Sequence, residues 1–163
     1  MFKFNLASFD VREEYLLEIK QGDVVFDPAF IIDDVLRIKV ILTKDKDNSV
    51  IAEGEIKGDI LLKCGRCLED YKKSIDINFA TVYKGKKVYT KEDEESGYNI
   101  YKNNEIDMYN YIRDTLILEI PIKLVCRDDC KGLCPVCGKN LNNQICDCVR
   151  QSRFRILDDF KLK

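Results

Sequence analysis

The sequence predicts an α+β protein: an antiparallel sheet (a meander or partial barrel) packed by a helix, with a C-terminal four-cysteine zinc-knuckle module. Three neighbouring segments alternate apolar and polar residues, which predicts the sheet, and a later segment has apolar residues at helical spacing. Eight cysteines in close pairs, without any histidine, predict the module. At 163 residues and 45% hydrophobic composition, the chain is long enough to bury a real core.

The three predicted strands follow one another with short turns between them. Residues 35–43 alternate strictly between the two faces of a strand. Residues 50–63 form the second strand, in which Gly54 or Gly58 marks a bulge or bend, and residues 71–83 form the third. Consecutive strands with short connections favour an antiparallel meander or part of a barrel.

The chain after the third strand is predicted to contain a loop and a helix. Residues 84–97 change from basic to acidic with little periodicity, so we expect a solvated loop there. Asp107 is a suitable N-cap for a helix over residues 108–119, and Pro121 ends that helix.

Composition excludes several classes of function. With 27 basic and 29 acidic residues, the formal net charge is −2, which excludes a nucleic-acid binder that is basic over its whole surface. Without histidine, the chain holds no Ser-His-Asp or Cys-His catalytic pair, so we do not expect an enzyme. The first residues lack the apolar region of a secretory signal, and no segment approaches the roughly 18 apolar residues of a membrane span. We therefore expect a cytoplasmic protein with reduced thiols.

The strongest motif lies near the C-terminus, where a CPVCG run at 134–138 is followed by CDC at 146–148. In such a knuckle two sulfurs point at one ion, and the glycine lets the backbone turn back toward them. Four thiolates suit zinc in a closed structural site, while an iron–sulfur cluster is an alternative and a disulfide framework is disfavoured in a reducing compartment. The predicted ligands are Cys134, Cys137, Cys146 and Cys148.

The other four cysteines predict a second zinc site. Cys64 and Cys67 form another CxxC pair, and Cys126 and Cys130 could complete its ligand set. About sixty residues separate these pairs, so an ion would hold two distant segments together. Crossed pairings between the two sets are equally allowed by spacing alone.

We divide the chain into two parts that we expect to be integrated rather than independent. The α+β domain spans residues 1–122 and includes the CxxC knuckle at 64–67, and the cysteine-rich zinc-binding module with a C-terminal helix spans residues 123–163. Counting eight thiolates and two Zn²⁺ ions, the formal net charge becomes −6 in place of −2. Basic residues beside the motifs either offset this charge or contact phosphate. The candidates for contact with RNA or a partner are Arg66, Lys131, Arg150 and Arg153.

Three segments together resemble a known family: CGRCLEDY at 64–71, the apolar stretch at 106–126, and the cysteine-rich run at 126–148. They are similar to the YceD-like family, domain of unknown function 177, also called large ribosomal RNA subunit accumulation protein. The resemblance extends from about residue 35 to the C-terminus. It departs at Gln151-Ser152-Arg153, where many relatives have Asp-Pro-Arg.

The resemblance implies ribosome biogenesis: accumulation, processing or protection of large-subunit ribosomal RNA (rRNA), with that RNA, a ribosomal protein or an assembly factor as partner. It brings no catalytic residue. We therefore expect a non-catalytic, metal-binding factor with structural zinc, no membrane and no small-molecule substrate. The alternative is a thiol- or metal-dependent redox or sulfur-handling enzyme that uses Cys64 and Cys67. A nuclease is disfavoured, because the acidic run at 92–95 is typical of a solvated loop.

Overall fold

The protein is described by a computed structural model that covers residues 2–8, 10–24, 26–28, 30–46 and 49–148. Its internal contacts divide it into two compact units. The first unit comprises Met1–Leu62 and Tyr71–Ile122, and the second comprises Lys63–Asp70 and Lys123–Lys163. The CxxC pair at 64–67, which we assigned to the first domain from the sequence, therefore groups with the cysteine-rich segment.

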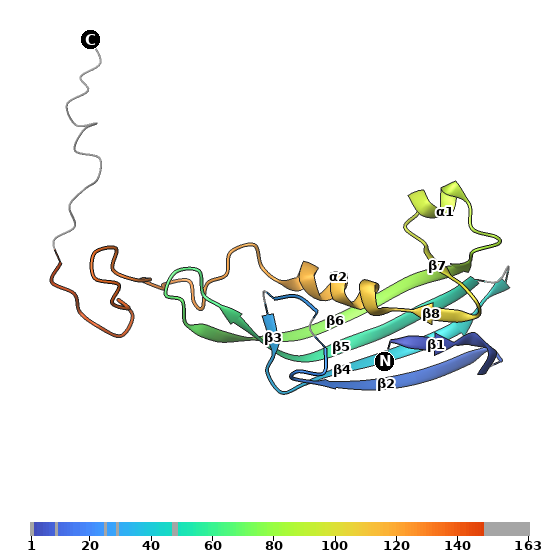
Figure 1. Cartoon of the computed structure of the whole chain (residues 1–163), viewed down its shortest axis with the longest axis horizontal. Coiled ribbons are helices and arrows are strands. Elements are labelled where there is room, and N and C mark those ends of the chain that lie inside the picture. The colour runs from blue at the N-terminus through green and yellow to red at the C-terminus, as the bar shows by residue number, and fades with distance from the viewer. Residues whose placement is uncertain (1, 9, 25, 29, 47–48, 149–163) are drawn as a thin grey trace, which may run out of the picture. The chain divides into compact units, whose positions relative to one another are not determined.

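A long sheet dominates the first unit (Figure 1). Its strands lie in the order β2-β4-β5-β6-β7, and β3 pairs with β5 off this path. The bounds are β2 Arg12–Lys20, β3 Phe30–Ile32, β4 Val35–Lys44, β5 Ser49–Lys63, β6 Asp70–Gly85 and β7 Asn99–Tyr101. The three predicted strands are thus confirmed as β4, β5 and β6. The expected all-antiparallel sheet needs one correction, because β6 and β7 pair in parallel.

Alternation along β4 builds the centre of the core. Leu36, Ile38, Val40 and Leu42 are fully buried on one face, since successive side chains of a strand point to opposite sides. Along β5 the pairing partner changes at Gly58: the ladder with β4 ends before this residue and the ladder with β3 begins after it. The glycine predicted to mark a bend therefore lies where β5 passes from one neighbour to the next.

Strand β2 was not predicted. It pairs with β4 along its whole length, so that Ile19 lies opposite Leu36 and is fully buried. Its outward positions are mostly charged, and Glu18 pairs with Arg37 across the ladder at 3.3 Å. Within β2 these charges break up every apolar run, although apolar residues still recur at alternate positions on the inward side of the strand.

The N-terminal residues also contribute to the core. Strands β1 (Lys3–Asn5) and β8 (Glu105–Asp107) form a separate antiparallel pair, in which Phe4 and Ile106 lie opposite each other and are buried. Nearby, the ring of Tyr109 lies 5.7 Å from that of Phe2 and 5.8 Å from that of Phe26, between ring centroids. Such tilted or stacked aromatic contacts add to burial.

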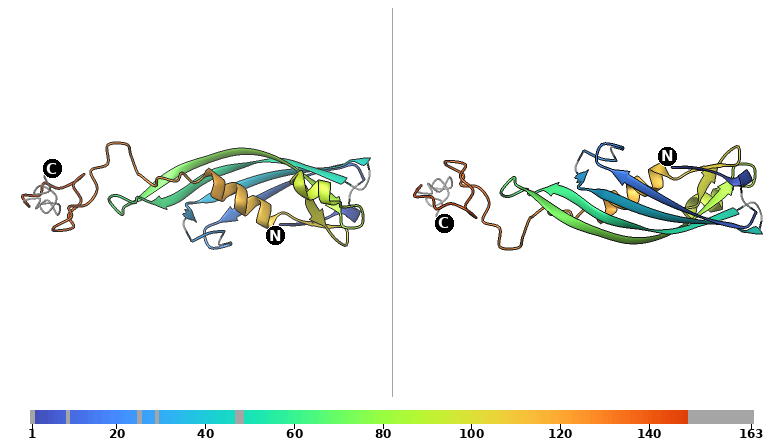
Figure 2. Two further views of the ribbon diagram at one scale, coloured as in Figure 1. Left: turned by 90° about the horizontal axis from the view of Figure 1, so that it is seen from above. Right: turned by 90° about the horizontal axis from the view of Figure 1, so that it is seen from below.

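Helix α2 (Tyr109–Glu119) confirms the predicted helix within one residue of its start. Met108 occupies the N-cap, whereas the predicted cap Asp107 accepts a hydrogen bond from the backbone N–H of Tyr109 at 2.9 Å. The helix covers one face of the sheet (Figure 2), where the Tyr111 ring lies 5.7 Å from that of Phe79. Ile112 and Leu116 are fully buried. The apolar stripe predicted from spacing therefore faces the core.

The expected loop at 84–97 is wrong in part, because it contains helix α1 (Lys91–Glu95). Thr90 and Asp93 form a reciprocal capping box at its start, and the Asp93 carboxylate also pairs with the Lys84 ammonium. These local contacts order an acidic run that has no apolar periodicity. Among the described residues, no helix is long and apolar enough to cross a membrane.

Candidate metal centres

The second unit brings the eight cysteines together as two groups of four. The long-range quartet consists of Cys64, Cys67, Cys126 and Cys130, and the local quartet consists of Cys134, Cys137, Cys146 and Cys148. Within each quartet all four sulfurs lie within 4.8 Å of one another. Of the pairings that spacing allowed, the structure has the uncrossed one.

The sulfur positions fit a tetrahedral ion. Zinc–sulfur bonds of about 2.3 Å place the sulfurs of a tetrahedral site about 3.8 Å apart. In the long-range quartet the separations are 3.9 Å for Cys64–Cys130 and 3.7 Å for Cys67–Cys126. In the local quartet Cys146 lies 3.3 Å from Cys134 and 3.5 Å from Cys137. These distances are too long for disulfides, so all eight cysteines are free thiols able to hold two metal ions.

The first knuckle is the turn between β5 and β6, and its backbone presents N–H groups to sulfur. The backbone N–H of Arg66 donates to Cys64 Sγ at 3.4 Å, and the N–H of Leu68 donates to the Cys64 carbonyl at 2.9 Å. Leu68 has a φ of 61°, in the left-handed region. Such N–H donors stabilise thiolate and fix the direction of the sulfur.

The segment after α2 supplies the other two sulfurs of the long-range quartet. The backbone N–H of Cys126 donates to Cys64 Sγ at 3.4 Å, which joins the two segments directly. The Arg66 guanidinium donates to the carbonyl of Cys130 at 3.0 Å. The side-chain amide of Asn142 donates to Cys130 Sγ at 3.4 Å. Cys64, Cys67 and Cys130 are buried, so this quartet is largely shielded from water.

The second knuckle repeats the hydrogen bonds of the first. The backbone N–H of Val136 donates to Cys134 Sγ at 3.4 Å, and the N–H of Gly138 donates to the Cys134 carbonyl at 2.9 Å. Gly138 has a φ of 71°, the left-handed conformation that glycine adopts without steric cost. The backbone N–H of Cys148 donates to Cys146 Sγ at 3.4 Å. Only Cys134 of this quartet is buried, and Cys137 is exposed.

Each quartet contains both easily and poorly ionised thiols. Burial opposes ionisation of Cys64, but backbone N–H donors outweigh it and lower its pKa to about 6. Backbone donors, foremost that of Cys137, lower the pKa of Cys134 to about 6. Burial and the neighbouring thiols raise the pKa of Cys126 to about 12, and the neighbouring thiols raise that of Cys148 to about 12. Four thiols this close cannot all ionise unaided, and a divalent cation held between them would supply the missing positive charge.

Two of the four candidates for RNA or partner contact, Arg66 and Lys131, lie among the described residues. The Arg66 guanidinium is engaged with the carbonyls of Asp128 and Cys130, so its hydrogen bonds support the long-range quartet. Lys131 is exposed, and its backbone N–H donates to Asn142. Arg150 and Arg153, like the predicted C-terminal helix, lie outside the described residues.

Two residues that shape the quartets, Asn142 and Leu68, are not among those predicted from the sequence. Asn142 contacts a sulfur from a position 12 residues away in the chain, and no spacing rule predicts that. Leu68 could have been found, because it follows its CxxC pair as Gly138 follows the other.

The fold and the quartets define a class of protein: a sheet-based domain joined to a compact unit with two all-cysteine candidate metal centres. Residues 52–161 match the family described as large ribosomal RNA subunit accumulation protein YceD, and the chain belongs to this family. The resemblance noted in the sequence is thereby confirmed.

Similar proteins include the large ribosomal RNA subunit accumulation protein YCED homolog 1, chloroplastic, of Arabidopsis thaliana, which is 31% identical over 77% of this chain and 45% of its own length. An uncharacterized protein of Mycobacterium tuberculosis is 27% identical over 74% of this chain and 56% of its own length. The uncharacterized protein YlbN of Bacillus subtilis is 27% identical over 66% of this chain and 64% of its own length. The chain thus spans about half the length of the first two relatives. No solved structure matches it.

Proposed function

We propose that the protein is a non-catalytic factor in the accumulation, processing or assembly of large-subunit rRNA. The observation that carries this proposal is the family match over residues 52–161, whose description names that RNA. The chloroplastic relative has the same words in its name. Ribosome biogenesis in the cytoplasm also suits a protein whose eight cysteines are free thiols.

We infer that zinc occupies both quartets and has a structural role. Four sulfurs at nearly tetrahedral separations suit a closed site, whereas a catalytic zinc keeps one position open for water. The backbone and Asn142 donors direct the sulfurs toward a shared centre. In this role the ions replace the core that a unit so rich in turns cannot build for itself.

The charge of the protein favours a ribosomal protein or an assembly factor as its main partner. A formal charge of −2, or −6 with two zinc sites filled, does not attract RNA over a broad surface. We therefore expect weak and strongly salt-dependent binding to isolated rRNA. Tight binding that persists at high salt contradicts this view.

Depletion of the protein in its own cells, followed by complementation, tests the proposed function. We expect the ratio of large- to small-subunit rRNA to fall on depletion and to recover with the wild-type gene. A copy with Cys64→Ser and Cys134→Ser should recover it poorly, since each change removes one ligand of a quartet. An unchanged rRNA ratio after full depletion overturns the proposal.

Metal analysis and thiol titration separate this function from a thiol-based enzyme. We expect two zinc ions per chain and no fast-reacting thiol until a chelator is added. The local quartet should lose its ion first, because Cys137 is exposed. A metal-loaded protein in which Cys64 and Cys67 react at once favours a redox or sulfur-handling enzyme instead.

A further inference from the structure

A group of lysines in the first unit is left unexplained by the cysteine centres. Strands β6 and β7 run in parallel with Gly85 opposite Tyr101, so the next residues, Lys86 and Lys102, emerge side by side. The backbone N–H of Lys86 donates to the Tyr101 carbonyl at 3.1 Å, which holds the two chains together at this point. Lys87 follows directly and brings a third positive charge.

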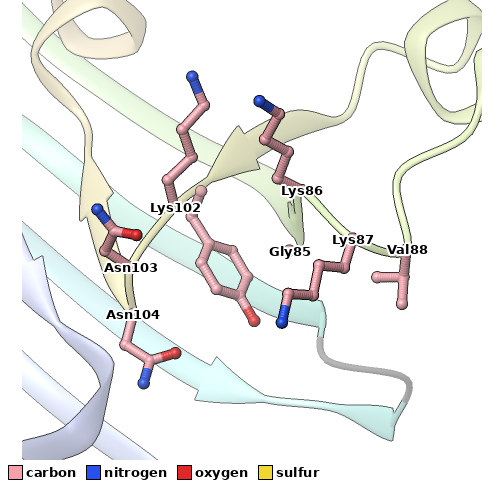
Figure 3. Close-up of a pocket in the computed structure, with 8 residues that line it drawn as sticks. Gly85, Lys86, Lys87, Val88, Lys102, Asn103 and Asn104 are labelled. Atoms are coloured by element: carbon pink, nitrogen blue, oxygen red, sulfur yellow. The ribbon is translucent and has the colours of Figure 1, made fainter.

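These lysines line a hollow of about 630 Å³ (Figure 3). Lys86 and Lys102 extend in the same direction, and Lys87 extends the opposite way. Directly after Lys102, Asn103 and Asn104 form a tight turn with φ of 54° and 56°, closed by a 2.9 Å hydrogen bond from Glu105 N–H to the Lys102 carbonyl. Asparagine tolerates this left-handed backbone, so the turn is well specified.

An aromatic ring forms part of the same hollow. Tyr101 lines it, and a Cβ atom on Gly85 would lie only 3.2 Å from the Tyr101 hydroxyl oxygen and 3.3 Å from the adjacent ring carbon. Glycine at position 85 therefore lets the ring lie close against the end of β6. Sites for single-stranded nucleic acid combine these two features, because bases stack on the aromatic ring and the lysines neutralise the phosphates.

The three lysines of the hollow differ from Lys84 and Lys3 in their ion pairing. Among the described residues, Lys86, Lys87 and Lys102 make no ion pair, whereas Lys84 pairs with Asp93 and Lys3 pairs with Glu105. Like charges held side by side repel one another unless an anion lies between them. The ammonium groups of Lys86 and Lys102 extend one way and that of Lys87 the other, which suits a chain of phosphates better than one small anion.

We propose that this hollow binds the backbone of a single-stranded segment of large-subunit rRNA, with the three lysines on phosphates and the Tyr101 ring against a base. The proposal rests on the proposed function and gives it a place of direct RNA contact. It assigns that contact to the first unit rather than to Arg66, whose guanidinium is already engaged with backbone carbonyls.

Fluorescence anisotropy with a labelled single-stranded RNA of large-subunit sequence tests the proposal on the full, zinc-loaded chain. Each neutralised phosphate contributes about 0.7 to the slope of log affinity against log salt, so K86Q/K87Q/K102Q should reduce the slope by about 2 and weaken binding roughly 100-fold near 0.1 M salt. K20Q/K46Q/K123Q changes the net charge equally outside the hollow and should change affinity much less. K86R/K87R/K102R should retain binding.

Three results overturn the proposal. The first is an equal loss of RNA affinity in K86Q/K87Q/K102Q and K20Q/K46Q/K123Q, and the second is a loss of affinity that appears only in R66Q/K131Q. The third is competition by an acidic polyglutamate peptide that is as effective as competition by unlabelled RNA. The last result indicates a surface for acidic proteins. Circular dichroism and zinc content check that each variant is folded. In depleted cells, full recovery of the rRNA ratio by K86Q/K87Q/K102Q overturns RNA binding at the hollow but leaves the proposed function standing.

Discussion

The two quartets share one knuckle geometry but differ in how much of the chain they join. In both, the second residue after the first cysteine donates its N–H to that sulfur at 3.4 Å, and the fourth donates to that cysteine's carbonyl at 2.9 Å. In the long-range quartet the sulfurs that approach each other are 59 and 66 residues apart in the chain. In the local quartet the separations are 9 and 12 residues.

This difference gives the two centres different roles in folding. Closing the longer loop costs about 1.6 kcal/mol more chain entropy, and an ion that holds it closed offsets that cost. The long-range quartet fastens the β5–β6 turn to the segment that follows α2, whereas the local quartet orders one short stretch. The local quartet is also the more exposed of the two.

The largest expected effect comes from breaking the long-range quartet. Cys64→Ser should lower the free energy of unfolding by at least about 3 kcal/mol, since structural zinc contributes about 10–16 kcal/mol in small zinc domains and one of four ligands is lost. Denaturant unfolding followed by circular dichroism measures the change for the whole sheet, and metal analysis should find one zinc fewer.

Cys146→Ser is the matched control in the local quartet. It should also lose one zinc, but the unfolding of the sheet should change little because this quartet joins only neighbouring residues. Equal losses of sheet stability in the two variants contradict the distinction between a long-range and a local centre.

Much of the fold could be predicted because one face of each long strand is apolar. The apolar residues Leu36, Ile38 and Val40 at alternate positions predict β4 from the local sequence alone. Strand β2 was not predicted because outward charges, such as Glu18, separate its inward apolar residues from one another. These inward residues become buried only where β4 lies beside them. Helix α1 was missed because its capping box is local chemistry without apolar periodicity.

The candidate centres were predictable in part for a similar reason. Spacing identifies the close pairs, since two sulfurs two residues apart can reach one ion. It cannot say which pairs share an ion, because thiolates are interchangeable and the pairing depends on where the chain after α2 runs. The Asn142 contact with Cys130 depends on the same tertiary arrangement.

An intermediate effect is expected from Asn142, a residue of the local stretch that serves the long-range quartet. Asn142→Asp replaces a donor to Cys130 Sγ with a carboxylate, which repels the thiolate. Loss of such a supporting contact typically costs tenfold to hundredfold in metal affinity, or about 1.4–2.8 kcal/mol. In competition with a chromogenic chelator, the zinc of the long-range quartet is expected to leave more slowly than that of the local quartet. Asn142→Asp should make this slower release faster than in the wild-type protein.

Asn143→Asp is the control for that change. Asn143 donates to Glu69 Oε1 at 3.1 Å and contacts no sulfur in the described part of the chain, so the same change of charge should leave both zinc affinities nearly unaltered. If Asn143→Asp weakens zinc binding as much as Asn142→Asp does, general electrostatics rather than the sulfur contact is responsible.

The smallest expected effect tests whether the two knuckles are equivalent at the residue after each CxxC pair. Leu68 and Gly138 have φ of 61° and 71°, a backbone that costs a non-glycine residue about 1–2 kcal/mol. Leu68 is 57% exposed, so its side chain contributes little burial. Leu68→Gly should therefore raise the free energy of unfolding by up to about 1 kcal/mol, after allowance for the greater freedom of glycine in the unfolded chain.

Gly138→Ala should lower the free energy of unfolding by about 1 kcal/mol. The effect should come from the backbone alone, because a Cβ at position 138 meets no atom within 4 Å. Gly97→Ala provides the reference, since Gly97 has a φ of 75° and similar open space but belongs to the first unit. Gly97→Ala should lower the free energy of unfolding by about the same amount and leave zinc release unchanged. Gly138→Ala, in contrast, should speed zinc release from the local quartet. If Leu68→Gly lowers stability instead, the Leu68 side chain itself stabilises the long-range quartet, and the two knuckles are alike in hydrogen bonding but not in energetics.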